Sequence, residues 1–450
     1  MIDDRHSTWA GSERWVPRRF VRPFVRFTRI EAASGILLLI AAVVAIVWAN
    51  SGWSDTYFEL LDEHLTLEFF GIELDESLQH LINDGLMAIF FFVVGLEIKR
   101  ELVLGDLRDA RSAALPVVAA LGGMVVPATI YILLNAGTAG EAIQGWGIPM
   151  ATDIAFAVGI IALLGSRVPA PAKLFLLALA IADDIGAIAV IAIFYTNELD
   201  LTSLAAALAA LTLVWAASRV KIRSLAFYVP MALAIWYFTL KSGIHATLAG
   251  VALGFLTPAR PYYRPRDFDE RARSILDQYP LEPESVRAQE HADHEAMLLS
   301  EVSLEAVAPL NRMEQRLQVW SSFLIVPLFA LANAGVDFRG TSFGEAASST
   351  VALGVALGLI FGKTLGVSLF TLGAVRLGIG KLPTGTTWRH VLGLSAVAGV
   401  GFTVSLFIAG LAFTDPHIVD LSKVGIFLGS AISGIVGALI LLGAKPKSPL

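Results

Sequence analysis

Long apolar runs constrain the fold of this chain more than any other feature. Windows of about 17 to 25 residues, enough to cross a bilayer as helices, recur along most of its length. The chain is 56% hydrophobic and 16% charged, with a mean hydropathy of +0.68, which excludes an ordinary soluble enzyme. We predict an all-α polytopic membrane protein with about twelve transmembrane helices, at 32–50, 84–98, 113–136, 146–165, 174–195, 203–218, 225–240, 244–258, 318–336, 350–375, 388–412 and 421–443.

The charges of the connecting loops support this count. The N-terminal segment has seven arginines, whereas the connection 51–80 has eight acidic residues and no Lys or Arg. Basic residues return in every second connection, at Lys99, Arg100, Arg108 and Arg111, then Arg167 and Lys173, then Arg219, Lys221 and Arg223, then Arg376, Lys381 and Arg389, and finally Lys445 and Lys447. Because Lys and Arg mark cytoplasmic loops, we predict that both termini face the cytoplasm, as an even number of spans requires.

One stretch between the spans is rich in charge and proline. It suggests a division into a cytoplasmic basic N-terminal segment (1–30), a first membrane region (31–257), a charged cytoplasmic loop (258–317), a second membrane region (318–443) and a cytoplasmic C-terminus (444–450). The loop is either a regulatory or interfacial helix or, as we prefer, a solvated linker with some helix. We interpret His291 and His294 within it as surface histidines.

Two adjacent aspartates lie in the middle of the apolar run from Leu174 to Tyr195. A single charged Asp at the centre of a membrane helix raises the free energy of insertion by about 2.5 to 3.5 kcal/mol, so Asp183 and Asp184 are strongly unfavourable there if both are charged and unpaired. Desolvation favours the protonated form of a carboxyl group, and a bound cation relieves the same cost. The pair therefore indicates a cation or proton site. The alternative is a purely structural role, in which hydrogen bonds hold both aspartates in the protein interior.

Two other spans have weak points near their middles. Pro149 and the neighbouring glycines weaken the helix near Thr152 and Asp153, and AGVGFTVS weakens the span 388–412. Unwound backbone inside a bilayer is tolerated only where protein or a watery cavity satisfies it, so these spans suggest crossed half-helices. Asp153 can compensate facing helix N-termini there, and Lys363 can compensate facing C-termini or pair with Asp183.

Taken together, the segments IADDIGAI, ATDIAFA, VGLEIKREL, KSGIHATLAG, FGKTLG and GVGFT resemble the NhaA-type sodium/proton antiporter family. The resemblance covers Asn83 to Gly443. It implies twelve spans with two inverted three-helix repeats near spans 3–5 and 10–12, crossed discontinuous helices, and export of Na⁺ or Li⁺ in exchange for protons. Crossed broken helices are a known feature of this family, so the resemblance, and not the residue pattern alone, implies this geometry.

The resemblance also implies roles for individual residues. Asp184 would be the main Na⁺ ligand, and Asp183 would exchange a proton or a salt bridge with Lys363, while Thr152 and Asp153 lie beside them. Residues of an entrance funnel or of pH regulation would be Glu97, Arg100, Glu101, His245 and Glu314. The chain departs from the family in its longer loop before span 9 and in Gln318, which stands where a histidine is common.

Each of these residues also has a structural interpretation. In this interpretation Asp153 only caps a broken helix, and Lys363 only compensates the partial negative charge of helix C-termini. His245 is then a hydrogen-bonded core histidine, although the ordinary histidine pKa near 6.5 would also suit a pH sensor. Glu97, Lys99, Arg100 and Glu101 are otherwise a charge cluster at the end of a helix.

The simplest mechanism is competition between protons and a small hard cation for the same carboxylate oxygens. The resemblance implies two protons per Na⁺, an electrogenic cycle, pH regulation, a homodimer in the bacterial inner membrane, and no cofactor or nucleic-acid partner. The alternative function is a proton-coupled carrier of another solute. An intramembrane aspartyl protease is disfavoured because such enzymes place their two acids on separate helices.

Overall fold

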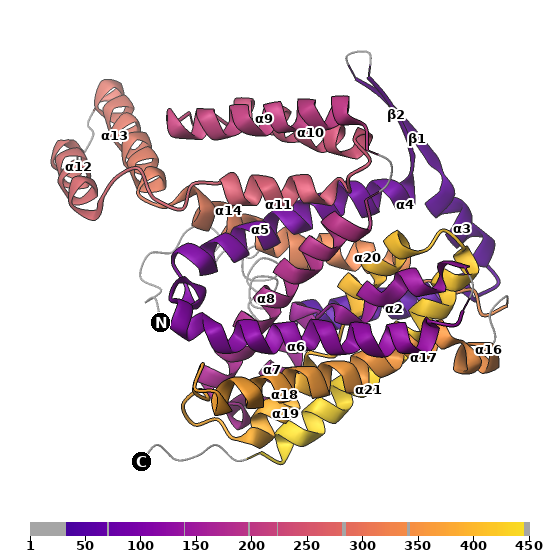
Figure 1. Ribbon diagram of the computed structural model, residues 1–450. Coiled ribbons are helices and arrows are strands. Elements are labelled where there is room, and N and C mark those ends of the chain that lie inside the picture. The colour runs from indigo at the N-terminus through magenta and orange to yellow at the C-terminus, as the bar shows by residue number, and fades with distance from the viewer. Residues whose placement is uncertain are drawn as a thin grey trace.

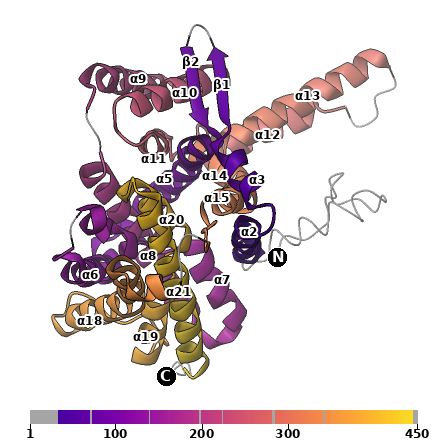
Figure 2. The same ribbon diagram turned by 90° about the vertical axis from the view of Figure 1, so that its right-hand side faces the viewer.

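The structure is a computed structural model that describes residues 33–69, 72–138, 140–196, 199–222, 224–280, 285–339 and 343–444. The predicted basic segment 1–30 and the basic residues Lys445 and Lys447 lie outside the described residues. The described chain forms a bundle of helices from which a two-stranded hairpin and a helical hairpin project (Figures 1 and 2).

Every predicted span corresponds to an observed helix or pair of helices, so the predicted fold is confirmed. Within the described ranges, seven helices are long and apolar enough to cross a membrane. They are α4–η3–α5 (Leu78–Val103), α6 (Ala110–Asn135), α8 (Ala170–Phe194), α9 (Leu201–Arg219), α14–η7–α15 (Pro309–Asn333), α17–η8–α18 (Thr350–Arg376) and α21 (Pro416–Leu442).

The remaining spans are bent or short. Three helix pairs in the described ranges pass the same test only when taken together. Helix α2 (Ala33–Ala49) meets α3 (Ser54–Asp62) at a bend of 111°, and α19 (Trp388–Val397) meets α20 (Phe402–Ala412) at 46°. The third pair, bent by 41°, is η5 (Gly140–Met150) and the segment Ile154–Arg167, which begins with α7 (Ile154–Leu164). Two shorter apolar helices complete the set, α10 (Leu225–Lys241) and α11 (Thr247–Leu256).

The outer surface of the bundle is apolar. Leu133, Leu163 and Ile193 are each at least 70% exposed, and many other large apolar side chains point outward from the long helices. A water-soluble protein rarely exposes so large a contiguous apolar surface, whereas lipid tails cover it without cost. The molecule is therefore a multi-pass membrane protein.

Two groups of three spans have the same order of a long, a broken and a long helix. The first is α6, η5 with α7, and α8, and the second is α17–η8–α18, α19 with α20, and α21. Four spans lie between the groups, so the second enters the bilayer from the opposite side, as inverted repeats do. The groups meet where α6 packs along α18, at Gly122 and Gly366. A Cβ on Gly366 would lie 2.1 Å from the carbonyl oxygen of Gly122, so only glycine permits this approach.

The connection 51–80 contains a hairpin that the sequence analysis did not predict. Strands β1 (His64–Phe69) and β2 (Ile72–Ser77) pair antiparallel, with His64 opposite Ser77, and the hairpin projects at the top of Figure 1. The sequence HLTLEF alternates apolar and polar residues, which is a strand pattern. Its many acids favoured a loop in our prediction.

The charged loop before span 9 contains two helices, α12 (Pro265–Gln278) and α13 (Val286–Glu305), which pack on each other away from the bundle (Figure 2). The next helix, α14 (Pro309–Trp320), begins nine residues before the predicted span at 318. Pro309 is well suited to a first helical turn, and the polar run NRMEQRLQ kept the apolar window from including this turn. The predicted boundary at 317/318 therefore falls inside a helix.

Candidate functional site

The two broken spans cross where their backbones unwind. Residues 151–153 separate η5 from α7, and residues 398–401 separate α19 from α20. The Asp153 N–H donates to the Val400 carbonyl at 2.6 Å, and the Ser405 hydroxyl donates to the Ile148 carbonyl at 2.8 Å. Backbone groups freed by one break are thus satisfied by the other, which is the condition for irregular backbone at this depth.

Asp153 caps two helices at once. One carboxylate oxygen accepts the Phe156 N–H at 3.1 Å, at the start of α7. The other accepts the N–H and the hydroxyl of Thr403, at 3.2 and 2.6 Å, at the start of α20. Both helix N-termini carry partial positive charge, so a single buried carboxylate compensates both of them.

A third helix contributes to the crossing through serines that the sequence analysis missed. Ser430 of α21 accepts the N–H groups of Gly401 and Phe402, each at 3.3 Å, and so adds a second cap to α20. Ser433, one turn further on, is buried against Gly399. Within the described part of the chain, its hydroxyl has no hydrogen-bond partner. Small polar residues in an apolar helix were the only available signal for this role.

Asp183 of α8 is held on one side of its carboxylate. Its Oδ2 forms an ion pair with Lys363 Nζ and lies 2.6 Å from the Thr152 hydroxyl, and both charged side chains are fully buried. The Thr152 hydroxyl is also 2.8 Å from the Ala398 carbonyl. The other oxygen of Asp183, Oδ1, is buried and has no hydrogen-bond partner among the described residues. The described side chains and backbone therefore hold this carboxylate through Oδ2 alone.

A π-helical turn brings Lys363 to this position. The turn η8 (Gly358–Gly362) ends directly before Lys363, and Gly358 lies against the ring of Pro149 in the first broken span. A π turn inserts one extra residue, which rotates the following side chains by about 100° about the helix axis. Lys363 is consequently directed into the bundle.

Asp184 differs from its neighbour because nothing holds its side chain. It is 8% exposed, and no hydrogen bond or ion pair to its carboxylate occurs among the described residues. The charges that act on it are those of Asp183, Glu97, Asp153 and Lys363, of which three are acidic. Across the described ranges, no group of three or more His, Asp or Glu side chains is arranged to hold a metal ion.

A second charged cluster lies at the end of α5. Arg100 donates to Glu314 of α14 at 2.5 Å and to Glu101 at 3.2 Å. Glu97, one turn earlier, experiences the charges of all three. Lys99 donates instead to the Phe255 and Thr257 carbonyls, at 2.7 and 2.5 Å, and so caps the end of α11. The structure thus brings together four of the five residues predicted for the funnel.

His245 is the residue that does not join this cluster. It lies between α10 and α11, and its Nε2 is hydrogen-bonded to the carbonyl of Tyr195, the residue after α8. Tyr195 follows the C-terminal end of α8. Arg100 ends the second span and Arg167 precedes the fifth, so both lie at the other end of the bundle. Burial lowers the pKa of His245, which places its titration below about 6.5.

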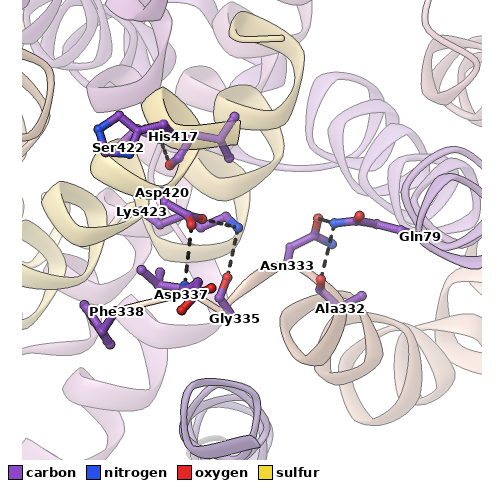
Figure 3. A network of polar contacts seen from close by, with 12 residues as sticks. Gln79, Ala332, Asn333, Gly335, Asp337, Phe338, His417, Asp420, Ser422 and Lys423 are labelled. Carbon is purple, nitrogen blue, oxygen red and sulfur yellow. Dashed lines mark hydrogen bonds and ion pairs between the residues drawn. The ribbon is translucent and has the colours of Figure 1, made fainter. Parts of the chain in front are cut away.

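A further polar network, not predicted from the sequence, lies where α15 (Val326–Asn333) ends (Figure 3). Asn333 exchanges side-chain hydrogen bonds with Asn83, at 2.7 and 3.2 Å, and Gln79 donates to it at 3.4 Å. Lys423 of α21 donates to the Gly335 carbonyl at 3.0 Å and pairs with Asp420 at 3.1 Å. These bonds fix the end of α15 between α4 and α21.

Comparisons with known proteins identify relatives along nearly the whole chain. The sequence profile of the family described as Na⁺/H⁺ antiporter 1 matches residues 25–441. The Na⁺/H⁺ antiporter NhaA of Rhodopirellula baltica is 46% identical over 429 residues, covering 95% of this chain and 96% of its own. The Na⁺/H⁺ antiporter NhaA of Anaeromyxobacter sp. is 49% identical over 426 residues, covering 94% and 91%. A solved structure, the sodium proton antiporter MjNhaP1 from Methanocaldococcus jannaschii at pH 8, is a distant likeness, with a TM-score of 0.46 and 17% identity over 91% of this chain and 92% of that one.

Proposed function

The chain belongs to the Na⁺/H⁺ antiporter 1 family, which confirms the resemblance found in the sequence, and on that premise we propose that it exchanges Na⁺ for H⁺ across a membrane. Its relatives are named as antiporters, which supports transport as its activity. We further propose that the exchange exports Na⁺, or Li⁺, in a bacterial inner membrane. Both termini face the cytoplasm, the protein is a homodimer, and no cofactor is required.

The observation that supports this proposal best is the contrast between the two aspartates. Asp183 is bound by Lys363 and Thr152, whereas the adjacent Asp184 has no partner among the described residues and is surrounded mainly by acidic charge. An unpaired carboxylate in such a site either takes up a proton or binds a cation. Asp184 is thus the principal ligand for which Na⁺ and H⁺ compete, and alkaline cytoplasm favours Na⁺.

Lys363, paired with Asp183, supplies the second proton of the cycle. Na⁺ at Asp184 also draws on Oδ1 of Asp183 and weakens the ion pair with Lys363, whose ammonium then gives up a proton. Two protons then exchange for one Na⁺, and one net charge crosses in each cycle. Each such charge gains about 2.3 kcal/mol per 100 mV, so the membrane potential drives sodium export. Transport that did not respond to an imposed potential would contradict this stoichiometry.

The remaining residues have supporting roles in the proposal. Asp153 and Thr152 keep the crossing intact beside the cation, and the repeats rock against the other helices to expose it to each side in turn. A pH-sensitive entrance is formed by Glu97, Arg100, Glu101 and Glu314, and His245 responds to pH from the opposite end of the bundle.

Everted or reconstituted vesicles test the proposal directly. Adding Na⁺ or Li⁺ to vesicles with an acidified interior should release protons from wild-type vesicles, increasingly so as the pH is raised. Asp184→Asn should reduce the signal to that of vesicles without the protein, because an amide neither ionises nor balances the charge of a cation. The matched control, Asp200→Asn, changes an exposed cap of α9 and should retain exchange.

The same assay distinguishes the alternative function. A proton-coupled carrier of another solute would give proton movement that is independent of Na⁺ and Li⁺. A response of this kind, or full exchange by Asp184→Asn, would overturn the proposal.

A further inference from the structure

The helical hairpin α12–α13 has an open apolar groove between its helices. The groove encloses about 460 Å³ and is lined by Ile275, Leu276 and Tyr279 of α12 and by Ala296 and Leu299 of α13, among others. Leu276 is 56% exposed and Tyr279 is 39% exposed. The two helices pack on each other, and the hairpin projects away from the long helices of the bundle (Figures 1 and 2).

The walls of this groove are acidic on one side. Helix α13 contains one arginine, Arg287, against five acids, which are Glu290, Asp293, Glu295, Glu301 and Glu305. Glu295 lines the groove and is only 6% exposed; His291 Nδ1 lies 4.0 Å from its Oε1, and no Lys or Arg lies within ion-pair distance in the described part of the chain. A buried carboxylate beside apolar side chains suits an arginine whose aliphatic stem lies along the groove. The sign of the charge disfavours an anionic lipid surface as the partner.

A segment with the complementary composition precedes α2. Residues 14–29, RWVPRRFVRPFVRFTR, contain six arginines, one tryptophan, three phenylalanines and no acid. Phe20 lies 13 residues before Ala33, so an extended chain carries it up to about 45 Å from the start of α2, compared with about 30 Å for the whole length of α13. The segment can therefore extend along the hairpin from its base.

The start of α2 lies at the correct end of the bundle for this contact. Helix α2 packs along α15, and at its far end Asn50 bonds to the Val336 carbonyl at 2.7 Å and to the Phe338 N–H at 2.9 Å. Because Asn50 follows α2 and Val336 follows α15, the two helices run in the same direction. Ala33 consequently lies toward the end at which α14 begins, where the hairpin is attached (Figure 2).

We propose that the basic segment 14–29 of this chain docks in the groove between α12 and α13. Its aromatic side chains cover Leu276 and Tyr279, and its arginines pair with Glu295 and the exposed acids of α13. The contact is made within one chain, and it does not depend on which ion the protein transports.

The docked segment would be mechanically connected to α14. The base of the hairpin is bonded to the helix that follows, through Tyr262 N–H to the Glu305 carbonyl at 3.0 Å and Leu310 N–H to the Pro258 carbonyl at 3.1 Å. Arg312 of α14 also donates to the Leu304 carbonyl at 3.3 Å. Glu314, the partner of Arg100, is in the same helix, and a regulatory effect on that pair would rest on the proposed function.

Cysteine cross-linking of the full-length protein tests the docking, since the chain has no native cysteine. A Phe20→Cys, Leu276→Cys variant in detergent should form an intramolecular cross-link with a short bifunctional maleimide. The matched control pairs Phe20→Cys with Leu377→Cys, a 78% exposed position after α18, and should cross-link much less. Equal yields in the two variants, or cross-links only between differently tagged copies, would overturn the proposal.

Charge exchange provides a second, independent measurement. Glu290, Asp293 and Glu301 are changed together to arginine, and residues 14–29 are left unchanged. Trypsin should then cleave within residues 14–29 about fivefold faster than in the wild type, which is the effect of losing a few surface ion pairs. Reversing Glu59, Asp62 and Glu63, exposed acids in and after α3, should leave the rate unchanged. Arg18→Glu, Arg19→Glu and Arg22→Glu together should lower the cross-link yield, and combination with the reversed α13 should restore it. Protection that requires anionic lipid and ignores the charges of α13 would show that the segment lies on the membrane, against the proposal.

Discussion

Two ion pairs of this molecule, Asp183–Lys363 and Arg100–Glu314, occupy contrasting environments. Lys363 and Asp183 at the crossing are both 0% exposed, whereas Arg100, which pairs with Glu314 at the end of α5, is 34% exposed. Water reaches and screens the Arg100 guanidinium, although the Glu314 side chain is only 6% exposed, whereas it reaches neither partner of the first pair. A buried pair of this kind is weak evidence for stability and stronger evidence for a switch. The Arg100–Glu314 pair is better suited to adjusting the protein's response to its surroundings, because losing it should destabilise the fold less.

The largest effect on stability should come from breaking the central pair. Lys363→Met leaves Asp183 buried without compensation and should lower the free energy of unfolding by about 3–5 kcal/mol. Adding Asp183→Asn to this variant should recover most of the loss, because no charge then remains unpaired. Thermal unfolding of the purified single and double variants measures both effects. Simple additivity of the two substitutions would show that the pair is not coupled.

Removing the shared cap at the crossing should have the next largest effect. Asp153→Ala deletes the caps of α7 and α20 together, at about 1 kcal/mol for each, and should destabilise the protein by about 2 kcal/mol. Asp153→Asn should lose much less, since asparagine is also a good cap. Asp200→Ala removes the single cap of α9 and serves as the comparison in the same unfolding experiment. An equal loss for Asp153→Ala and Asp200→Ala would contradict the double cap.

The pair at the end of α5 should be worth less than either. Arg100→Gln should cost about 1 kcal/mol after screening by solvent, and the cost should shrink as salt is added. Its clearest consequence should be a changed dependence of exchange on pH, measured in vesicles as a shifted midpoint with an unchanged maximum rate. A loss as large as that of Lys363→Met would remove the contrast between the two environments.

The smallest effect should come from His245. Because burial lowers its pKa, the unfolded chain binds more protons there than the folded protein just below about pH 6.5. This contribution to stability is complete above that pH and is lost as the pH falls. The wild type should therefore lose more thermal stability on acidification than His245→Gln does. A parallel decline of both proteins would assign the acid sensitivity to other groups.

The sequence predicted the spans and the crossing well because both depend on local composition. Apolar length identifies a span, and Pro149 and the glycines near Thr403 weaken helices wherever they occur. Which partners meet depends on packing between distant segments. The serines of α21 left only a weak signal, as small polar residues in an apolar helix, and the network around Asn333 depends on segments far apart in the sequence. The π turn before Lys363 leaves no local signature, because one extra residue in a turn changes no composition. The hairpin 64–77 did have a local alternating pattern, which its acidic residues obscured.

The double cap at Asp153 has a consequence for how a cation gains access to the site. One carboxylate is fastened to the beginnings of two helices, so neither half of the crossing can withdraw without leaving bare amide groups in a dry interior. The two halves of the crossing are therefore held together as one body. In the proposed function that body moves with its repeats, and access from either compartment is controlled where the repeats meet the surrounding helices.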